Sequence, residues 1–176
     1  MTKLGAKELR KTDPSSEEIK AIKRHPIYIV LDNVLDTYNI GSIFRLADAV
    51  AAEKVYLCGE TEYPPNHRIE KASIGTWRWV PWEHCDSATE AIKNLRSNIK
   101  DLQVVAVEQN SKSIRFDQYD YQLPICIVVG HETEGVSKEV LEMADAIVEL
   151  PMFGINKSLN VMVSAGIILY KIAEKI

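Results

Sequence analysis

The sequence predicts an α/β fold in which a mainly parallel sheet carries helices on both faces. Short apolar runs alternate along the chain with longer segments of helical periodicity, and this alternation favours parallel pairing of the strands. The chain has 176 residues, of which 46% are hydrophobic and 26% are charged. That composition excludes a disordered chain, and the length allows one domain with a sizeable core.

The strands are predicted from apolar runs bounded by polar or turn residues. They lie near residues 27–31, 54–58, 78–82, 102–107, 125–129 and 146–150. Helices are predicted near residues 41–52, 67–73, 88–99, 138–144 and 158–174. The helix over 88–99 has the clearest signals, because Ser87 and Glu90 have capping-box spacing. Its apolar residues also recur at four-residue steps.

The apolar runs, the first residues and the cysteine spacing narrow the classes of protein to which the chain can belong. No apolar run is long enough to span a membrane, and the first residues lack the apolar stretch of a secretory signal, so we expect a cytoplasmic protein with no membrane partner. The three cysteines show no CxxC spacing, and no metal site is predicted. Cys58 and Cys126, in or beside apolar strands, are predicted to be core thiols.

Three polar segments follow directly on predicted strands. They cover residues 32–45, 130–137 and 150–161. In open α/β sheets ligands bind at the carboxyl edge of the strands, so these segments are expected to meet in one site. In the third segment Ser158 is predicted to be the N-cap of the last helix. Asn160 would lie one turn inside that helix, where its buried amide must hold a loop, a ligand or another subunit.

The three segments carry motifs in a fixed order: Asn39 to Arg45, Gly130-x-Glu132-x-x-Gly135, and Pro151-Met152 with Ser158-Leu159-Asn160. Together they resemble the SpoU/TrmH family of SPOUT RNA methyltransferases, over about residues 27–176. The resemblance implies a SPOUT methyltransferase catalytic domain (26–176); the residues before it, 1–25, are a basic N-terminal extension outside the match. It also implies methyl transfer from S-adenosyl-L-methionine to a ribose 2′-hydroxyl of RNA.

The resemblance further implies which residues form the site. The catalytic set is Arg45, Asn39, Glu132, Ser158 and Asn160. The cofactor-binding set is Val107, Glu108, Gly130, Leu150, Met152, Ser158 and Leu159. No Gly-x-Gly-x-x-Gly follows the first strand, so the dinucleotide fingerprint is absent; adenosine without phosphates needs an apolar slot and backbone groups instead. Local alternatives remain open: Asn39 as a cap, Glu132 as a ligand of loop amides only, and Gly130 as a turn glycine. His131 lies between matched residues and is given no role.

Arg45 is the candidate for handling charge on the substrate. A guanidinium is protonated at neutral pH, so its use as a general base would cost several kcal/mol. We therefore favour a role in gripping the RNA phosphate and stabilising the developing alkoxide, while the family resemblance also allows a base. The structural alternative is a solvated arginine paired with Asp48, three residues further along the helix.

The charge balance argues against broad RNA binding, because the net charge is −4 and the pI about 5.6. The RNA contact should then be local. One basic group lies before the first strand (Lys3, Lys7, Arg10, Lys11, Lys20, Lys23 and Arg24), and a second comprises Arg68, Lys71 and Arg78. The three tryptophans at 77, 79 and 82 are expected to pack in the core or an interface rather than stack on bases. With no appended RNA-binding domain, tRNA is the preferred substrate; rRNA, or a non-catalytic RNA-binding protein of the same fold, is the alternative.

The last predicted helix bears on oligomeric state. It is apolar on almost all sides from Leu159 to Tyr170, and a helix of this kind is buried all round. Few elements of this chain remain to cover its outer side, so a homodimer through this helix is expected, with a fully internal helix as the alternative. The family resemblance also implies a homodimer, and a C-terminal trefoil knot formed by the chain after Leu150. Nothing in the periodicity predicts a knot.

Overall fold

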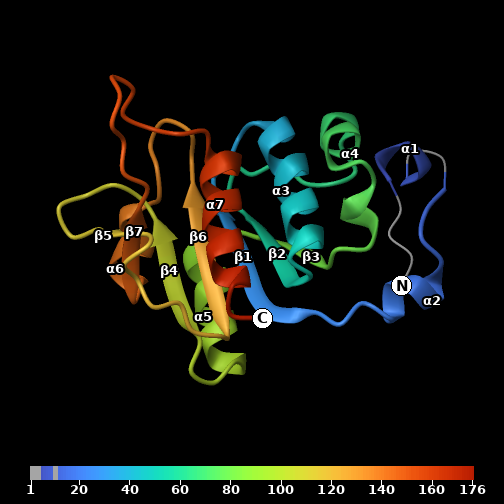
Figure 1. Cartoon of the computed structure of the whole chain (residues 1–176), viewed down its shortest axis with the longest axis horizontal. Helices are drawn as coiled ribbons and strands as arrows, with labels where there is room; N and C mark the ends of the chain where they lie inside the picture. Colours follow the sequence, from blue (N-terminus) through green and yellow to red (C-terminus); the bar gives the residue numbers. More distant parts are fainter. Residues whose placement is uncertain (1–4, 10–11) are drawn as a thin grey trace.

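The computed structural model describes residues 5–9 and 12–176. Within these residues seven strands form one sheet in the order β3-β2-β1-β6-β4-β7-β5, and every pair of neighbours is parallel (Figure 1). The strands are β1 (His25–Asp32), β2 (Ala52–Cys58), β3 (Trp82–Cys85), β4 (Gln103–Val107), β5 (Ile114–Arg115), β6 (Ile125–Gly130) and β7 (Ala146–Glu149). The prediction of a mainly parallel sheet is confirmed.

Helices cover both faces of the sheet, as predicted. They are α1 (Ala6–Leu9), α2 (Ser16–Lys20), α3 (Thr37–Ala49), α4 (His67–Ser73), the 3-10 helix η1 (Thr76–Arg78), α5 (Ala88–Asn98), α6 (Lys138–Met143) and α7 (Val161–Ala173). Helices α3 and α7 pack side by side on one face, and α5 lies on the other with α6 (Figure 1). No helix in the described part of the chain is long and apolar enough to cross a membrane.

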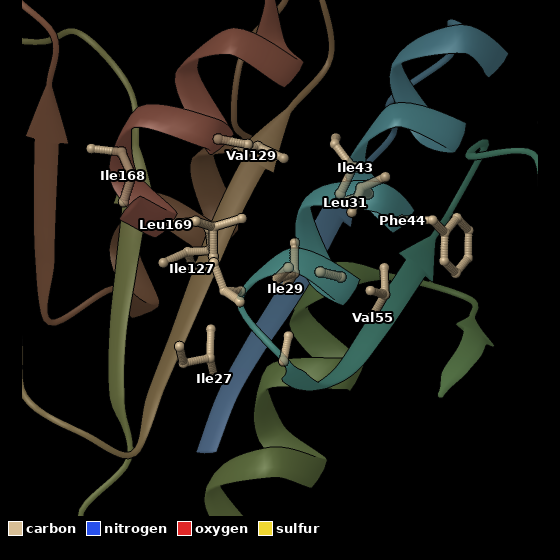
Figure 2. Close-up of a cluster of buried hydrophobic side chains, with 14 of the residues drawn as sticks. Ile27, Ile29, Leu31, Ile43, Phe44, Val55, Ile127, Val129, Ile168 and Leu169 are labelled. Carbon is tan, nitrogen blue, oxygen red and sulfur yellow. The ribbon is translucent and has the colours of Figure 1, made fainter. Parts of the chain in front are cut away.

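Alternating side chains of the strands build two cores. Ile27, Ile29 and Leu31 of β1 face α3 and α7, whereas Val30 belongs to the cluster under α5. Figure 2 shows the first cluster, in which Leu169 of α7 lies beside Ile127 of β6. Because successive side chains of a strand point to opposite faces, a strand that is apolar throughout must be buried on both. Cys58 and Cys126 are buried in the second cluster, which confirms them as core thiols.

The predicted strand over 78–82 is wrong. Ile74 and Gly75 have positive φ angles of 53° and 85°, so the chain turns after α4 and enters the short 3-10 helix η1. Strand β3 begins only at Trp82, after Pro81. Trp79 is buried, and its indole nitrogen donates to Oδ1 of Asp48 over 2.7 Å.

The expectation that the tryptophans pack in the core is therefore confirmed, since the other two pack against the same cluster. The two-residue strand β5 was not predicted, because both of its residues are exposed and carry no apolar pattern.

The N-terminal segment is docked on the domain over its described part. Ile19 and Ile22 pack against the first core cluster. The guanidinium of Arg24 donates to the backbone oxygens of Ala52 (3.0 Å) and Trp79 (2.6 Å), and desolvation of the group lowers its pKa. Arg24 is therefore engaged within the fold. Lys3, Arg10 and Lys11 of the predicted basic group lie outside the described residues, and the side chain of Lys7 does too.

Candidate functional site

One cavity of about 520 Å³ opens at the carboxyl edge of the sheet, above β4, β6 and β7. The loops that follow β6 and β7 border it, at the top of Figure 1. Residues 107–109, 129–135, 148–150, 152, 156–161 and 164 line it. All seven residues predicted to bind the cofactor are among them. The expectation that the second and third polar segments meet at this edge is confirmed.

The loop after β6 is packed too closely to accept larger residues. A Cβ on Gly130 would collide with the backbone of Gly135 and the amide nitrogen of Val136. Gly135 has a φ of +73°, and a Cβ there would collide with the carboxylate of Glu108. Gly130 is thus required by a close backbone approach, and its own φ is not positive. Glu108 Oε2 accepts from the Val136 amide over 2.9 Å, which ties the end of β4 to this loop.

Glu132 joins the first and second polar segments. Its carboxylate accepts from the backbone amides of Leu35 (3.1 Å) and Asp36 (3.0 Å) and from Nδ2 of Asn39 (3.0 Å). Partial burial raises the pKa of Glu132, but the hydrogen bonds from Asn39, Leu35 and Asp36 outweigh it and hold the pKa below its ordinary value. Glu132 therefore accepts hydrogen bonds from loop amides, as in the local alternative, and it also accepts one from Asn39 of the catalytic set.

Asn160, not Ser158, is the N-cap of α7. Its Oδ1 accepts from the amides of Met162 (2.9 Å) and Val163 (3.4 Å), so the helix begins at Val161, three residues later than predicted. Ser158 lies in the exposed loop, where its amide donates to Oδ1 of Asn156 over 3.4 Å. The prediction of Asn160 as a buried residue inside the helix is wrong, because asparagine is a strong cap and competes with serine two residues earlier.

A chain of hydrogen bonds connects the three motifs. Glu132 can only accept, so Asn39 offers it Nδ2 and turns its Oδ1 to Nδ2 of Asn160, 3.0 Å away. Asn160 in turn presents its own Oδ1 to the first turn of α7. Asn39 is 6% exposed and lies within α3, which begins four residues earlier than predicted because Asp36 caps it. The chain of bonds fixes the start of α7 beside the cavity.

Arg45 lies apart from this group. It is exposed on α3 and is not among the residues that line the cavity. The alternative ion pair with Asp48 does not form: Oδ1 of Asp48 accepts from Trp79, and no ion pair of Arg45 is found in the described part of the chain. Its guanidinium is therefore directed at solvent, where a substrate could meet it.

The comparison with known families agrees with the motifs. The model of the family described as "SpoU rRNA Methylase family" matches residues 26–170. The chain belongs to this family. It is similar to the tRNA (guanosine(18)-2′-O)-methyltransferase of Aquifex aeolicus, with 32% identity over 154 residues, 88% of this chain and 72% of that protein. It is also 30% identical over 172 residues to a 23S rRNA (guanosine-2′-O-)-methyltransferase of Haemophilus influenzae, covering 97% of this chain and 68% of the relative.

Solved structures of SpoU proteins have the same fold. The crystal structure of the A. aeolicus TrmH/SpoU tRNA modifying enzyme matches with a TM-score of 0.79 at 31% identity, over 97% of this chain and 81% of that one. The S-adenosylmethionine-bound rRNA methyltransferase of Sinorhizobium meliloti matches with a TM-score of 0.79 at 28% identity, over 95% of this chain and 60% of that one.

In this SpoU protein hydrogen bonds connect Asn39, Glu132 and Asn160, and among the described residues none joins Arg45 or Ser158 to them. Ser158 does line the same cavity as Glu132 and Asn160. Sequence reasoning missed one carboxylate that shapes the same edge. Asp32, 3% exposed at the end of β1, accepts from the Ser137 amide over 2.8 Å. Ser137 occupies the N-cap position of α6, but its side chain makes no capping hydrogen bond. The signal for Asp32 was present, since it is an acid directly after a buried strand.

Proposed function

We propose that this chain is an S-adenosylmethionine-dependent methyltransferase that acts on a ribose 2′-hydroxyl of RNA. The observation that carries the proposal is the cavity at the carboxyl edge, where the seven expected cofactor residues meet the end of the Glu132–Asn39–Asn160 chain. Family membership supports the reaction class. The names of the A. aeolicus and H. influenzae relatives, which are ribose methyltransferases of tRNA and rRNA, support the substrate class.

The cavity suits the cofactor in size and lining. Its volume of about 520 Å³ lies within the range of small-molecule sites, roughly 300–1,000 Å³. Val107, Leu150 and Leu159 offer apolar surface for a purine, and the backbone of 129–135 and 148–150 offers donors and acceptors for its edge and ribose. When bound, the cofactor supplies a methyl group already activated on a sulfonium, so the chain has to align the acceptor hydroxyl and assist loss of its proton.

Different residues hold the cavity and bind the RNA. The hydrogen bonds of Glu132, Asn39 and Asn160 hold the cavity walls in position. Arg45 is outside the walls and meets the RNA: its guanidinium binds a phosphate through two N–H groups and stabilises negative charge that develops on the attacking oxygen. A guanidinium remains protonated at neutral pH, which suits this role better than that of a base.

The RNA surface extends from Arg45 onto α4. Helix α4 packs tightly on α3, because Gly41 of α3 lies directly against Ala72. Arg68 and Lys71 of α4 are exposed, and no ion pair of either is found within the described residues. Arg78 instead pairs with Asp13 of the N-terminal segment. The cationic surface of Arg45, Arg68 and Lys71 allows this acidic protein to bind RNA phosphates locally. We favour tRNA as the substrate, with rRNA second.

The active form is a homodimer through α7. The inner side of this helix is formed by the buried residues Ala165, Ile168, Leu169 and Ile172. Its outer side exposes a row of apolar residues, Val163 (39%), Ile167 (36%) and Tyr170 (58%), and Leu159 (40%) is exposed just before the helix begins. This row continues into the loop before the helix, where Phe153 and Ile155 are almost fully exposed. A contiguous apolar row of this size is costly in water and is covered by a second copy of the same helix.

A transfer assay tests the proposal. The protein is incubated with methyl-labelled S-adenosylmethionine and with unmodified tRNA or rRNA, and label is mapped to nuclease-resistant positions. Arg45→Ala is expected to lower the single-turnover rate by about 10²–10⁴-fold and to leave cofactor affinity nearly intact. Lys100→Ala is the matched control, because Lys100 is exposed at the opposite edge of the sheet. Cofactor binding without label on any RNA would favour the non-catalytic alternative, and full activity of Arg45→Ala would refute the role of Arg45.

A further inference from the structure

His131 lies in the cavity wall and is tied to its own loop through one ring nitrogen. Nδ1 of His131 lies 2.9 Å from the amide nitrogen of Thr133 and 3.1 Å from that of Glu134. Backbone amides can only donate, so Nδ1 accepts both bonds and carries no proton. The proton of the neutral ring is then on Nε2. The ring therefore has one tautomer and no charge in this arrangement.

The loop of residues 131–137 depends on a few acceptors. The backbone of His131 and Gly135 exchanges two hydrogen bonds, of 3.0 and 2.9 Å. Side chains accept from four further amides: Nδ1 of His131 accepts from two, Glu108 accepts from that of Val136, and Asp32 accepts from that of Ser137. Glu108 and Asp32 accept as carboxylates. An imidazole differs, because protonation between about pH 5 and 8 turns its acceptor nitrogen into a donor.

We propose that His131 is a positioning residue whose neutral form holds the loop of the cofactor cavity, and whose protonation releases that loop. This inference rests on the proposed function of the cavity as the S-adenosylmethionine site. Protonated Nδ1 would face two N–H groups, so both bonds would be lost at once. Glu132 is the next residue, and its bonds to Asn39 and the Leu35 amide depend on the position of the same loop. Protonation of one ring thus loosens the contact between the first two motifs.

The charges around the ring are the same in any variant at position 131. The charged residues that line the cavity with it are Glu108, Glu132, Glu134, Glu149 and Lys157. Asparagine is the informative replacement, because its amide oxygen can accept the Thr133 and Glu134 amides as Nδ1 does but does not titrate. His131→Asn therefore keeps the loop and removes the switch. His131→Ala removes both.

Calorimetry of S-adenosylmethionine binding to the full chain tests the inference. For the wild type the Kd is expected to rise about tenfold between about pH 8 and about pH 5.5, as two hydrogen bonds are lost. His131→Asn should bind like the wild type at about pH 8 and keep a markedly flatter pH dependence. His131→Ala should bind about tenfold more weakly at both values. Titration of the ligand itself is common to all three proteins, so the difference between wild type and His131→Asn isolates the ring.

Two results would overturn the inference: the same pH slope in wild type and His131→Asn, or wild-type affinity in His131→Ala. Absence of cofactor binding by the wild type at every pH would instead refute the proposed function. NMR of the free protein tests His131 in that case as well. The amide signals of Thr133 and Glu134 should shift as the ring titrates, the Nε2-protonated tautomer should be present at high pH, and His131→Asn should abolish the shift. A ring protonated on Nδ1 at high pH would contradict the inference.

Discussion

A double-mutant cycle on Asn39 and Asn160 would test whether the three motifs are coupled as the hydrogen bonds indicate. Asn39→Ala removes a bond of 3.0 Å to the Glu132 carboxylate and leaves Nδ2 of Asn160 without its acceptor. Asn39 is 6% exposed, and bonds to charged groups and neutral bonds contribute about 1.5–3 and about 1 kcal/mol. With a discount for the solvent-exposed carboxylate, the expected loss in the free energy of unfolding is about 2–3 kcal/mol.

Asn160→Ala removes the cap of α7, worth about 1 kcal/mol, together with the same shared bond. The single variant should therefore lose about 2 kcal/mol. Because both single variants remove the bond between Asn39 and Asn160, the double variant should lose about 1 kcal/mol less than the sum. Urea unfolding curves measure the three losses, and calorimetry of S-adenosylmethionine binding shows whether the cavity weakens in parallel.

The control cycle pairs Asn39→Ala with Asn98→Ala. Asn98 is exposed at the end of α5, where its Nδ2 donates to the Asn94 backbone oxygen over 2.7 Å, and it has no bond to the site. These two changes should add to within about 0.5 kcal/mol, as independent sites do. If the losses of Asn39→Ala and Asn160→Ala also added to within about 0.5 kcal/mol, the motifs would not be coupled.

Three further predictions concern the loop, the carboxylate and the outer face of α7. Gly130→Ala should destabilise the protein by about 1–3 kcal/mol and weaken cofactor binding, because its methyl group would collide with the Gly135 backbone; an unchanged urea midpoint would contradict this. The lowered pKa of Glu132 means that its stabilising contribution is complete above its ordinary pKa of 4.5 and is lost as the pH falls through the lower folded value. Acid unfolding should therefore be less steep in Glu132→Gln, and identical profiles would count against the hydrogen bonds. Ile167→Glu should convert the dimer to monomers in sedimentation experiments, whereas Lys93→Glu on exposed α5 should not; a wild type that is already monomeric would exclude the dimer.

The sequence determined the layered fold, because its signals are local. Runs such as Ile27 to Leu31 are too apolar to face water on either side, so they predict a strand in a two-sided parallel sheet wherever they lie in the chain. Helix α4 was also predicted from the local sequence, and its predicted bounds of 67–73 agree with the structure. The error at 78–82 had a local cause too, since a left-handed turn at Ile74 and Gly75 decided the geometry of a tryptophan-rich segment that resembles a strand.

The site could be predicted as a set of residues but not as an arrangement. The motif-bearing loops follow strand ends, which predicted that they lie at one edge of the sheet. The motifs themselves predicted residues that line the cavity. The arrangement depends on contacts between residues far apart in the chain. Asn39 and Glu132 are 93 residues apart, and Asn39 and Asn160 are 121 residues apart. Serine and asparagine both cap helices, so local propensity does not choose between Ser158 and Asn160.

The tertiary structure makes the choice, because the buried Asn39 donates to Glu132 through Nδ2 and accepts from Asn160 through Oδ1, which holds Asn160 at the start of α7. The role of His131 was likewise hidden from the sequence. A histidine there predicts neither a tautomer nor a partner until the loop folds back and brings two amides to one ring nitrogen. Composition and periodicity therefore determined what is buried, and the folded backbone determined which polar atoms meet, since hydrogen bonds depend on distance and direction and burial does not.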